Sequence, residues 1–407
     1  MNILFLHRDY PAQFKYLALA LANNPANNVM FATENDTIDI KGITKYVFKI
    51  SHDKKTTNPY LTLYDEVLEY AQAAIKIAKE IKAKGIKPDV IYGFGFWGFD
   101  MFMKDVFPDV PVISYFEWFY NTKGADIGFD GKTFTEEENA QMRCKNSHLL
   151  VDLYSCDAGI SPTYWQRNQF PKEFHEKIKV IHDGIDTETC CPNPNAEFFI
   201  AKKDLKLTVK DEVITYGTRG MEPYRGFVQF MEAAEKLLKK RPNAHIVIAG
   251  LDDVYYGPRL KECTYKEYML KKLDLDTSRL HFVGALSFVD YVRLLQISSV
   301  HVYLTFPYIL SWSILNAMSA GCCVIASDTA PVLEVIQDNY NGLLFNFYNI
   351  DQLVEKVDYA LENRNKMLEI RNNARQTVLD KYDVRKLLMQ QINFINSVIV
   401  KHRGAQQ

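Results

Sequence analysis

The sequence has no excess of positive charge, no long apolar run and no leader-like start. Lys and Arg number 48 against 50 Asp and Glu, and this balance argues against a protein built to bind nucleic-acid phosphates. No uninterrupted apolar run approaches the roughly 18 residues that a membrane-spanning helix needs. Residues 1–9 lack the basic region and the apolar core of a signal peptide. We therefore expect a cytoplasmic protein without a nucleic-acid partner, and a peripheral contact with the inner face of a membrane stays open.

The cysteines follow no metal-binding or disulfide pattern. The 7 cysteines include neighbours at 190–191 and 322–323, but no CxxC or Cys/His spacing. An odd number of cysteines in a cytoplasmic chain is typical of reduced thiols that pack as small core residues. The pair Asp252 and Asp253 has no nearby residues that complete a ligand set, so we expect no metal site.

Length and composition predict two domains. A chain of 407 residues exceeds the size at which a single core keeps growing, so two domains of about 200 residues each are expected. A hydrophobic fraction of 47% is enough for two large cores. The Cys-Cys-Pro-Asn-Pro-Asn segment at 190–195 is typical of a linker between them.

The clearest pattern is a strand, a helix and a second strand in the second half of the chain. An apolar run at 302–305 precedes a loop, and Ser311 then stands where it can cap a helix over 312–320. Gly321 supplies a left-handed residue that ends this helix, and 322–326 is again a buried strand. This spacing predicts a parallel βαβ unit whose ligand crevice lies at the carboxyl ends of the strands.

The start of this predicted helix at Ser311 suits a diphosphate. Unpaired backbone N–H groups and the positive end of the helix dipole point toward the crevice. Asn316 follows on the same helix, where its side chain is placed to reach a ribose hydroxyl. A second turn at 327–330 opens another helix near Pro331. The alternative is that both turns are ordinary capped turns without a ligand.

Two arginines follow another predicted strand. A glycine-containing loop after this strand carries Arg219 and Arg225 and leads into a helix over 227–240. Two guanidiniums at the carboxyl end of a strand can clamp a diphosphate and neutralise its charge as it leaves. A solvated surface pair is the alternative. Gly284, after a strand at 280–283, leaves room for a nucleobase to approach the backbone.

The first half offers a ligand loop and two weaker signals. The loop at 7–14 follows the first strand and should therefore face a ligand crevice. The glycines within 93–98 match the dinucleotide pattern GxGxxG, and Glu117 lies near the spacing of a ribose-binding acid. Phe96 and Trp97 would crowd a pyrophosphate, so we favour a bend in an aromatic loop. Glu117 is itself a candidate to bind a sugar hydroxyl, and a structural role is the alternative.

The remaining elements are predicted from apolar periodicity. We expect strands at 29–33, 45–50 and 245–249, a polar loop at 121–139, and helices at about 15–23, 64–84, 140–153, 351–362, 364–379 and 384–401.

Taken together, these segments resemble the retaining glycosyltransferases of family four, which have the GT-B fold. In the second half the resemblance rests on Ala-Met-Ser-Ala-Gly, Ser-Asp-Thr, Pro-Val-Leu-Glu-Val-Ile and Asn-Gly-Leu-Leu, in this order. It extends over nearly the whole chain through LHRDYPAQF, EWFYNTKGADIGFD, SPTYWQRNQFP, VIHDGIDT, EPYRGF and VHVYLTFPYILSWSILNAM.

The resemblance implies an α/β protein with two Rossmann-like doubly wound domains that face a cleft. It places an acceptor-side domain at residues 1–188 and a donor domain at 189–384, with a last helix at 385–403 that packs back on the first domain. It also implies a nucleoside-diphosphate sugar as substrate and no required metal or other cofactor.

The resemblance also assigns site residues. Arg219 and Arg225 take the positions of the family's diphosphate-binding Arg and Lys, and Glu117 lies near the position where many members place a histidine. These three form the expected catalytic set. Tyr308 and Asn316 stand where the family usually has a pair of glutamates. The expected donor-binding residues are Gly217, Thr218, Gly284, Tyr308, Leu310, Ser311, Trp312, Leu315 and Asn316.

The implied function is a retaining transfer of a hexose-type sugar from a nucleoside diphosphate to a glycan, lipid-linked or protein-linked acceptor, in polysaccharide or glycoconjugate synthesis. The departing phosphate would take the acceptor's proton on the same face of the sugar. A non-catalytic GT-B protein that binds a nucleotide or glycan, or supports a partner enzyme, is the second hypothesis, because the glutamate pair is missing. An NAD-dependent enzyme is the third. Ala12 stands where the family often has a glycine.

Overall fold

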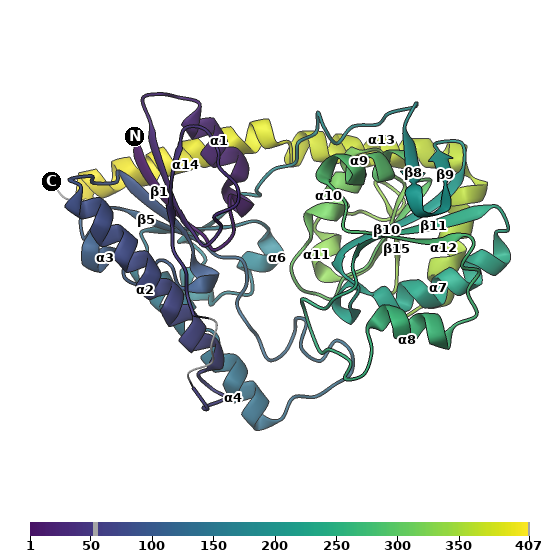
Figure 1. Cartoon of the computed structure of the whole chain (residues 1–407), viewed down its shortest axis with the longest axis horizontal. Helices are drawn as coiled ribbons and strands as arrows, with labels where there is room; N and C mark the ends of the chain where they lie inside the picture. The colour runs from purple at the N-terminus through teal and green to yellow at the C-terminus, as the bar shows by residue number, and fades with distance from the viewer. Residues whose placement is uncertain (52–55, 406–407) are drawn as a thin grey trace. The chain divides into compact units, whose positions relative to one another are not determined.

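The computed structural model describes residues 1–51 and 56–405, which fold as two compact α/β units (Figure 1). Unit 1 contains residues 1–184 and resumes at 384, and unit 2 contains residues 185–383. The sequence analysis placed the two boundaries at 188/189 and 384/385. The chain therefore passes from one unit to the other twice.

Unit 1 is built on a sheet of seven parallel strands in the order β3-β2-β1-β4-β5-β6-β7. Strand β1 pairs with both β2 and β4, which is a doubly wound arrangement. Residues 3–6 are all buried, so both faces of this sheet are covered, as the continuous apolar run predicts. The strands are β1 Asn2–Leu6, β2 Asn28–Thr33, β3 Ile43–Val47, β4 Val90–Phe94, β5 Val112–Tyr115, β6 Ala158–Ser161 and β7 Ile178–Val180.

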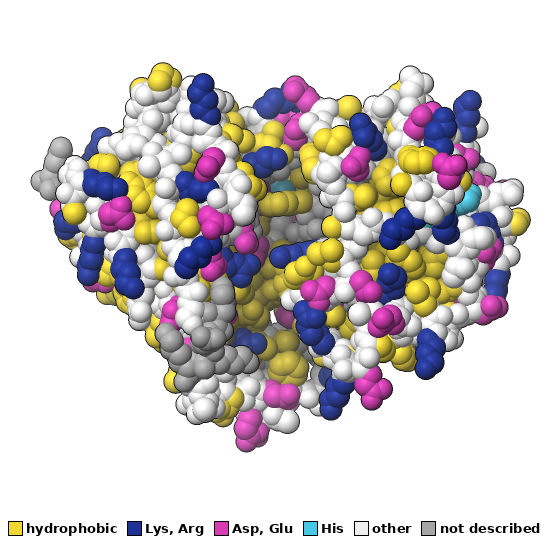
Figure 2. Space-filling view, in the orientation of Figure 1, with side chains coloured by type: hydrophobic (Ala, Val, Ile, Leu, Met, Phe, Trp, Pro, Cys, Tyr) yellow, Lys and Arg dark blue, Asp and Glu magenta, His cyan; other side chains and the backbone are white. Residues whose placement is uncertain are grey.

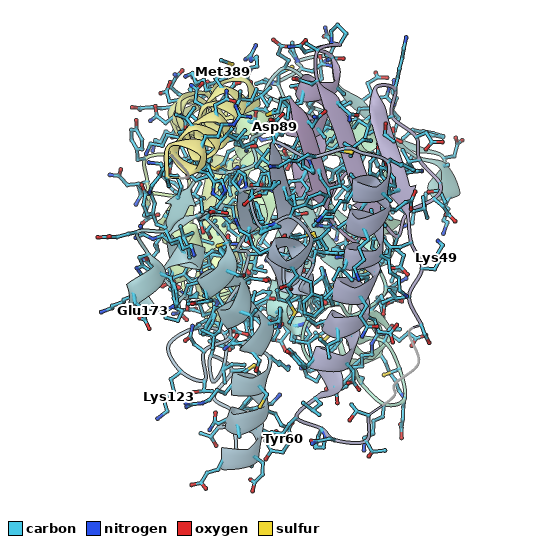
Figure 3. All side chains as sticks on the ribbon, turned by 90° about the vertical axis from the view of Figure 1, so that its left-hand side faces the viewer. Lys49, Tyr60, Asp89, Lys123, Glu173 and Met389 are labelled. Carbon is cyan, nitrogen blue, oxygen red and sulfur yellow. The ribbon has the colours of Figure 1, made fainter. Side chains whose placement is uncertain are left out.

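The helices of unit 1 include one that comes from the far end of the chain. Leu387, Ile395, Val398 and Ile399 of α14 join the same apolar core as β1 and β2, and α14 contacts α1 (Figure 1). Met389, labelled in Figure 3, lies on the exposed side of α14. The helices are α1 Lys15–Ala22, α2 Thr62–Ala83, α3 Met103–Val106, α4 Glu136–Cys144, α5 Ser147–Ser155, α6 Tyr164–Arg167 and α14 Val384–Ala405.

Unit 2 repeats the architecture with six parallel strands in the order β12-β11-β10-β13-β14-β15. The switch point lies between β10 and β13, since both β11 and β13 pair with β10. A separate antiparallel pair, β8 with β9, precedes this sheet. The strands are β8 Glu197–Ile200, β9 Leu205–Thr208, β10 Glu212–Gly220, β11 Ala244–Leu251, β12 Leu280–Gly284, β13 Val300–Tyr303, β14 Val324–Ser327 and β15 Leu343–Phe345.

The helices of unit 2 match the sequence analysis closely where the periodicity is strong. Helix α7 has the predicted bounds, and α10 is followed by Gly321 at φ +81°, the predicted left-handed residue. The helices are α7 Phe227–Lys240, α8 Tyr265–Lys272, α9 Phe288–Ile297, α10 Trp312–Ser319, α11 Ala330–Leu333, α12 Ile350–Glu362 and α13 Arg364–Lys381. The doubly wound α/β class is thus confirmed for each unit.

Three local predictions for unit 1 are wrong or displaced. The helix expected at 140–153 is broken into α4 and α5, because the Asn146 side chain bonds both backbone groups of Tyr120, at 2.9 Å and 2.8 Å. The strand expected at 45–50 lies at Ile43–Val47, on the sheet edge, and the buried Phe48 follows it. The polar loop at 121–139 ends early, since Thr135 caps α4.

The surface and the thiols agree with the composition. Figure 2 shows positive and negative side chains interspersed over the visible face, in keeping with a formal net charge of −2. All 7 cysteines are unpaired, as predicted. Within residues 1–51 and 56–405, no helix combines the length and the apolar character needed to cross a membrane.

Candidate active site

The carboxyl ends of β10, β13 and β14 meet at one edge of the unit 2 sheet, because these parallel strands are neighbours. The segments that leave them are 217–226, 304–311 and 327–329. They contain both arginines and the start of α10, so the sequence-predicted donor residues of unit 2 gather at one edge.

Arg225 lies against the loop that leads into α10. Its Nη1 donates to Thr305 Oγ1 and to the Ile309 carbonyl, both at 2.9 Å. Gly226 follows at φ +67°, where an added Cβ would lie 2.4 Å from Leu304 Cβ, so only glycine permits this close approach. Tyr216 of β10 donates its hydroxyl to the Arg225 carbonyl at 2.6 Å. The guanidinium is therefore held beside the segment that ends at Ser311.

Arg219 lies at the end of β10 and is exposed. Its guanidinium carbon stands 4.1 Å from the centre of the Tyr255 ring, a cation–π contact. The pairing of β10 with β11 becomes irregular between Gly217 and Gly220, which displaces the chain where the arginine occurs. Arg219 is thus in contact with the loop that follows β11, and no ion pair joins it to a carboxylate of the described residues.

Glu222 connects the two arginines, and sequence reasoning missed it. Its buried Oε2 accepts the backbone N–H groups of Tyr255 and of Tyr256, the latter at 2.9 Å. The Tyr255 ring lies under Arg219, and the Tyr256 ring lies 5.5 Å from the Arg225 guanidinium carbon. Burial raises the pKa of Glu222, and the two amide donors and both arginines oppose that rise. The sequence signal that could have identified Glu222 is its position midway between the two arginines.

Helix α10 begins as the sequence predicts. Ser311 is its N-cap, with Oγ accepting the Ser313 N–H at 3.2 Å. The Ser311 N–H donates to the Tyr303 hydroxyl at 3.0 Å, which ties the cap to β13. Trp312 is 42% exposed on the first turn. The turn at 327–329 also opens a helix, but α11 is a single turn.

Tyr308 and Asn316 have packing roles in unit 2. The Tyr308 ring is buried in edge-to-face contacts with Tyr224 and Tyr256, at 5.7 Å and 5.2 Å between centroids. The Asn316 Oδ1 lies 3.6 Å from Cys190 Sγ, within the range of a thiol hydrogen bond. Both residues therefore lie near the segment that bears Ser311, but neither adds a carboxylate to it.

The other predicted donor residues differ in what they offer. Leu310 and Leu315 are buried in the unit 2 core, which leaves only their backbone for a ligand. An added Cβ at Gly217 would lie 3.0 Å from the Tyr291 ring, and Thr218 Oγ1 donates to the Gly220 carbonyl at 3.0 Å.

Gly284 is the most open of these positions. It has φ +72°, and no described atom lies within 4 Å of an added Cβ. The expected approach of a nucleobase to this residue stays a prediction.

Glu117 belongs to unit 1 and is described within that unit. Its Oε1 accepts the Gln13 side-chain N–H at 3.1 Å, and its carbonyl accepts Gln166 Nε2 at 2.9 Å. Gln13 lies in the loop after β1, so this loop and the end of β5 do converge. The glycines of the GxGxxG match are explained by packing, since an added Cβ at Gly93 would lie 1.7 Å from Asp100 Oδ1.

The acidic and basic groups of the site form no metal centre. Over the described ranges 1–51 and 56–405, no group of three or more His, Cys, Asp and Glu side chains is placed to hold a metal ion. The charge offered to a ligand by the unit 2 edge is that of Arg219 and Arg225.

Comparison of the sequence with known protein families identifies the family of this chain. A model described as glycosyl transferase family 4 group matches residues 25–190, and one described as glycosyl transferases group 1 matches residues 198–377. The chain belongs to this glycosyl transferase family. The second match spans both arginines, Glu222 and α10, so the site described above lies inside the family's own region.

The curated relatives align with only about half of this chain. An N,N'-diacetylbacillosaminyl-diphospho-undecaprenol alpha-1,3-N-acetylgalactosaminyltransferase of Campylobacter jejuni is 28% identical over 176 residues, 43% of this chain and 42% of the relative. An uncharacterized glycosyltransferase of Methanocaldococcus jannaschii is 25% identical over 222 residues, 54% of this chain and 53% of the relative. The chain thus spans about half the length of the curated relatives that it matches.

Solved structures confirm the GT-B fold. The Anabaena protein HepE in complex with UDP-glucose superposes with a TM-score of 0.69 at 16% identity, over 98% of this chain and 100% of that chain. Sucrose-phosphate synthase of Thermosynechococcus elongatus gives a TM-score of 0.74 at 14% identity, over 98% and 100% of the two chains. At these identities the likeness concerns the fold.

Proposed function

We propose that the protein is a retaining glycosyltransferase that moves a hexose-type sugar from a nucleoside diphosphate to a glycan, lipid-linked or protein-linked acceptor in the cytoplasm. The observation that carries this proposal is the position of Arg225, whose Nη1 bonds Thr305 and Ile309 directly before the N-terminus of α10. A guanidinium and a helix N-terminus next to each other suit a diphosphate.

The proposed transfer proceeds on one face of the sugar. The acceptor oxygen forms a bond to the anomeric carbon while the bond from that carbon to the diphosphate oxygen breaks. The acceptor's proton passes to the departing phosphate, so the products are a glycoside of unchanged anomeric configuration and a nucleoside diphosphate. Arg219, Arg225 and the α10 N-terminus stabilise the charge that develops on the leaving group.

A metal ion is not part of the proposed chemistry, because two guanidiniums and a helix dipole supply the positive charge. We expect turnover to survive an excess of EDTA without loss. A rate that falls with EDTA and returns with Mg²⁺ or Mn²⁺ would contradict this part of the proposal.

The identity of donor and acceptor is supported by the relatives. HepE is known in complex with UDP-glucose, which makes a UDP sugar the first donor to test. The Campylobacter relative acts on a diphospho-undecaprenol glycan, which favours a lipid-linked acceptor. Glu117 is proposed to contact the donor sugar or the acceptor hydroxyl from unit 1.

A thermal-shift screen against UDP, GDP, ADP and CMP and their sugars tests the donor site. We expect a nucleoside diphosphate to raise the melting temperature, and Arg219→Ala or Arg225→Ala to reduce that rise and to abolish sugar release. Arg293→Ala is the matched control, because this exposed arginine of α9 forms an ion pair with Asp290 and lies outside the candidate site. No shift with any nucleotide at millimolar concentration would refute the donor site.

A non-catalytic nucleotide- or glycan-binding protein is the second candidate. It is favoured by Tyr308 and Asn316, which pack against Tyr224, Tyr256 and Cys190 and bring no carboxylate to the site. Nucleotide binding that depends on Arg219 and Arg225, without turnover of any donor, would select this candidate.

A peripheral membrane contact is proposed for α5, because three apolar side chains of this helix are exposed. Leu150, Val151 and Tyr154 are 43%, 41% and 84% exposed, and Lys177 lies beside them, with Nζ donating to the Leu153 carbonyl at 2.7 Å. Co-sedimentation with anionic vesicles should fall in Tyr154→Ser but not in Leu368→Ser, an exposed position of α13. Equal sedimentation of both variants would refute the contact.

A further inference from the structure

A cavity opens at the edge of the unit 2 sheet opposite to the candidate active site. Its volume is ≈ 320 Å³, and its lining includes Asn193, Ser298, Ser299, Arg364 and Arg371. The two serines directly precede β13, so the cavity lies at the amino ends of the parallel strands. A volume of this size is at the lower end of the range for small-molecule sites.

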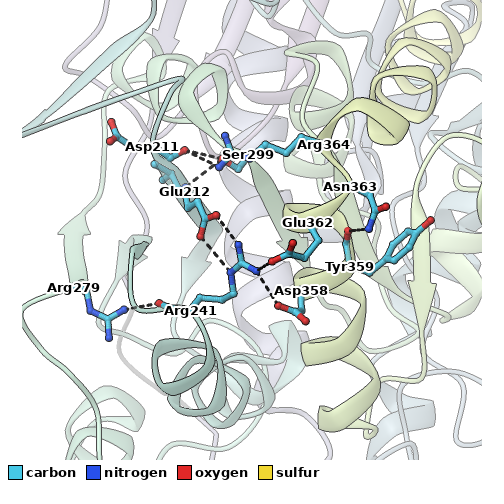
Figure 4. Close-up of polar contacts among 11 residues, drawn as sticks. Asp211, Glu212, Arg241, Arg279, Ser299, Asp358, Tyr359, Glu362, Asn363 and Arg364 are labelled. Carbon is cyan, nitrogen blue, oxygen red and sulfur yellow. Dashed lines mark hydrogen bonds and ion pairs between the residues drawn. The ribbon is translucent and has the colours of Figure 1, made fainter.

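Arg364 lines the cavity without an acidic partner. Its Nη2 donates to the Asp211 carbonyl at 3.3 Å, next to Ser299, whose Oγ donates to the same carbonyl at 2.9 Å (Figure 4). No carboxylate among the described residues forms an ion pair with Arg364.

Unlike Arg364, the neighbouring Arg241 has acidic partners. It forms ion pairs with Glu212, Asp358 and Glu362, so these three carboxylates are already paired with Arg241 (Figure 4). Arg364 is half-buried, and its charge is left for another anion.

Arg371 adds a second guanidinium two helical turns along α13. Positions 364 and 371 lie on the same face of the helix, as positions seven apart do. Arg371 is half-buried, its Nε donates to the Gly321 carbonyl, and it too has no ion pair with a carboxylate of the described residues. Both arginines therefore belong to the first two turns of α13, which begins at Arg364.

We propose that this cavity binds a small phosphorylated molecule. Two guanidiniums match a phosphoryl group, which accepts bidentate hydrogen bonds from arginine. The hydroxyls of Ser298 and Ser299 and the amides of Asn193 and Gln296 supply further polar contacts, while Ile297 and Met367 form an apolar part of the lining. This mixture is typical of a site that recognises one phosphate ester and not a bare ion.

Inorganic phosphate and glycerol phosphate, each titrated by calorimetry, are the probes for this site. Because phosphate also suits the candidate active site, the titrations are compared in Arg364→Gln and in Arg219→Gln. We expect Arg364→Gln to weaken binding of both probes at the cavity by about tenfold or more, the effect of a lost charge-assisted contact. Arg219→Gln should weaken only phosphate binding at the candidate active site, and Arg293→Gln, a surface control, should leave both binding events unchanged. Hydrogen exchange should slow at the Asn193 amide and at the start of α13 when the probe is bound.

Asn193→Asp keeps the fold and still tests the site. The Asn193 Oδ1 accepts the Asn195 N–H at 3.0 Å, and a carboxylate oxygen can accept it equally. Asn193 lines the same cavity as both arginines, so we expect the new negative charge to raise the melting temperature without ligand and to weaken binding of both probes. Phosphate binding that is equal in wild type, Arg364→Gln and Asn193→Asp, or no binding at millimolar concentration, would overturn the proposal.

Discussion

Ala12 holds a left-handed backbone conformation in the turn that follows β1, with φ at +46°. For a residue with a Cβ this conformation costs roughly 1–2 kcal/mol of conformational free energy, whereas glycine adopts it without that cost. The neighbouring Gln13 holds Glu117, so this turn is kept in place by contacts other than its own preference.

Ala12→Gly should therefore stabilise unit 1. The gain is limited to about 1 kcal/mol, because glycine also gives the unfolded chain more freedom. Urea denaturation followed by circular dichroism measures it. Ala20→Gly in the interior of α1 is the control and should instead destabilise by about 1 kcal/mol. A loss of stability in both variants would contradict the interpretation of Ala12.

Asp100 and Asp152 are buried acids of unit 1. Ser114 Oγ donates to Asp100 Oδ2 at 2.7 Å, whereas neither carboxyl oxygen of Asp152 has a hydrogen-bond partner among the described residues. Burial raises the pKa of Asp100 to about 7, although the Ser114 hydrogen bond opposes the rise. Burial, together with the charge of Asp100, raises the pKa of Asp152 well above its ordinary value. The folded protein therefore keeps protons that the unfolded chain releases above about pH 4.

The contribution of these two carboxyls to the free energy of unfolding should fall as the pH rises from about 4 through about 7, because in the unfolded state they bind fewer protons in this window. Asp152→Asn removes one of these titrations. We expect the variant to gain more stability over wild type at about pH 8 than at about pH 5, measured as the shift in urea midpoint. Asp109→Asn on the surface is the control. An equal gain at both pH values would refute the role of Asp152.

Glu222 shows which part of the candidate site the sequence leaves open. The two arginines could be predicted because each follows a strand in a recognisable loop. The partners of Glu222, Tyr255 and Tyr256, lie 33 and 34 residues further along the chain. Their contact depends on β10 and β11 being neighbours, and no local pattern encodes that pairing at the level of a single hydrogen bond.

Among the elements, α10 is the one whose start can be tested most directly. Ser311→Ala should cost about 1 kcal/mol of stability, because the Ser313 N–H loses its acceptor. Ser311→Asp keeps an acceptor at the cap but adds a negative charge where the diphosphate is proposed to bind. We expect near wild-type stability and weaker nucleoside-diphosphate binding in Ser311→Asp, from thermal shifts with and without UDP. Unchanged UDP binding in Ser311→Asp would separate α10 from the donor site.

Elements with strong periodicity were predicted well, and those shaped by distant contacts were not. Helix α7 and the α10–Gly321 unit carry their own apolar spacing and end signals, so their bounds follow from the sequence. The break between α4 and α5 depends on Asn146 reaching Tyr120, 26 residues away. The β8–β9 pair was not predicted at all, since its strands are short and only alternate residues are buried.

At the scale of the whole molecule, unit 1 depends on α14. Ile395 is 1% exposed in the unit 1 core, whereas Met389 on the same helix is 57% exposed (Figure 3). We expect Ile395→Ala to destabilise unit 1 by about 2–4 kcal/mol and Met389→Ala to change stability by less than about 0.5 kcal/mol. Hydrogen exchange resolved by peptide measures both, and unit 2 should remain protected. Equal loss of protection in both units would contradict their separate cores.

The return of the chain at residue 384 also has a consequence for biosynthesis. Unit 1 cannot complete its core until α14 has left the ribosome, after the whole of unit 2. Unit 2 is contiguous and can fold as it emerges. The nascent protein can therefore contain a folded unit 2 while unit 1 is still incomplete. During that interval α1 lacks the helix that packs against it, and a ribosome stalled before residue 384 leaves this part of the unit 1 core uncovered.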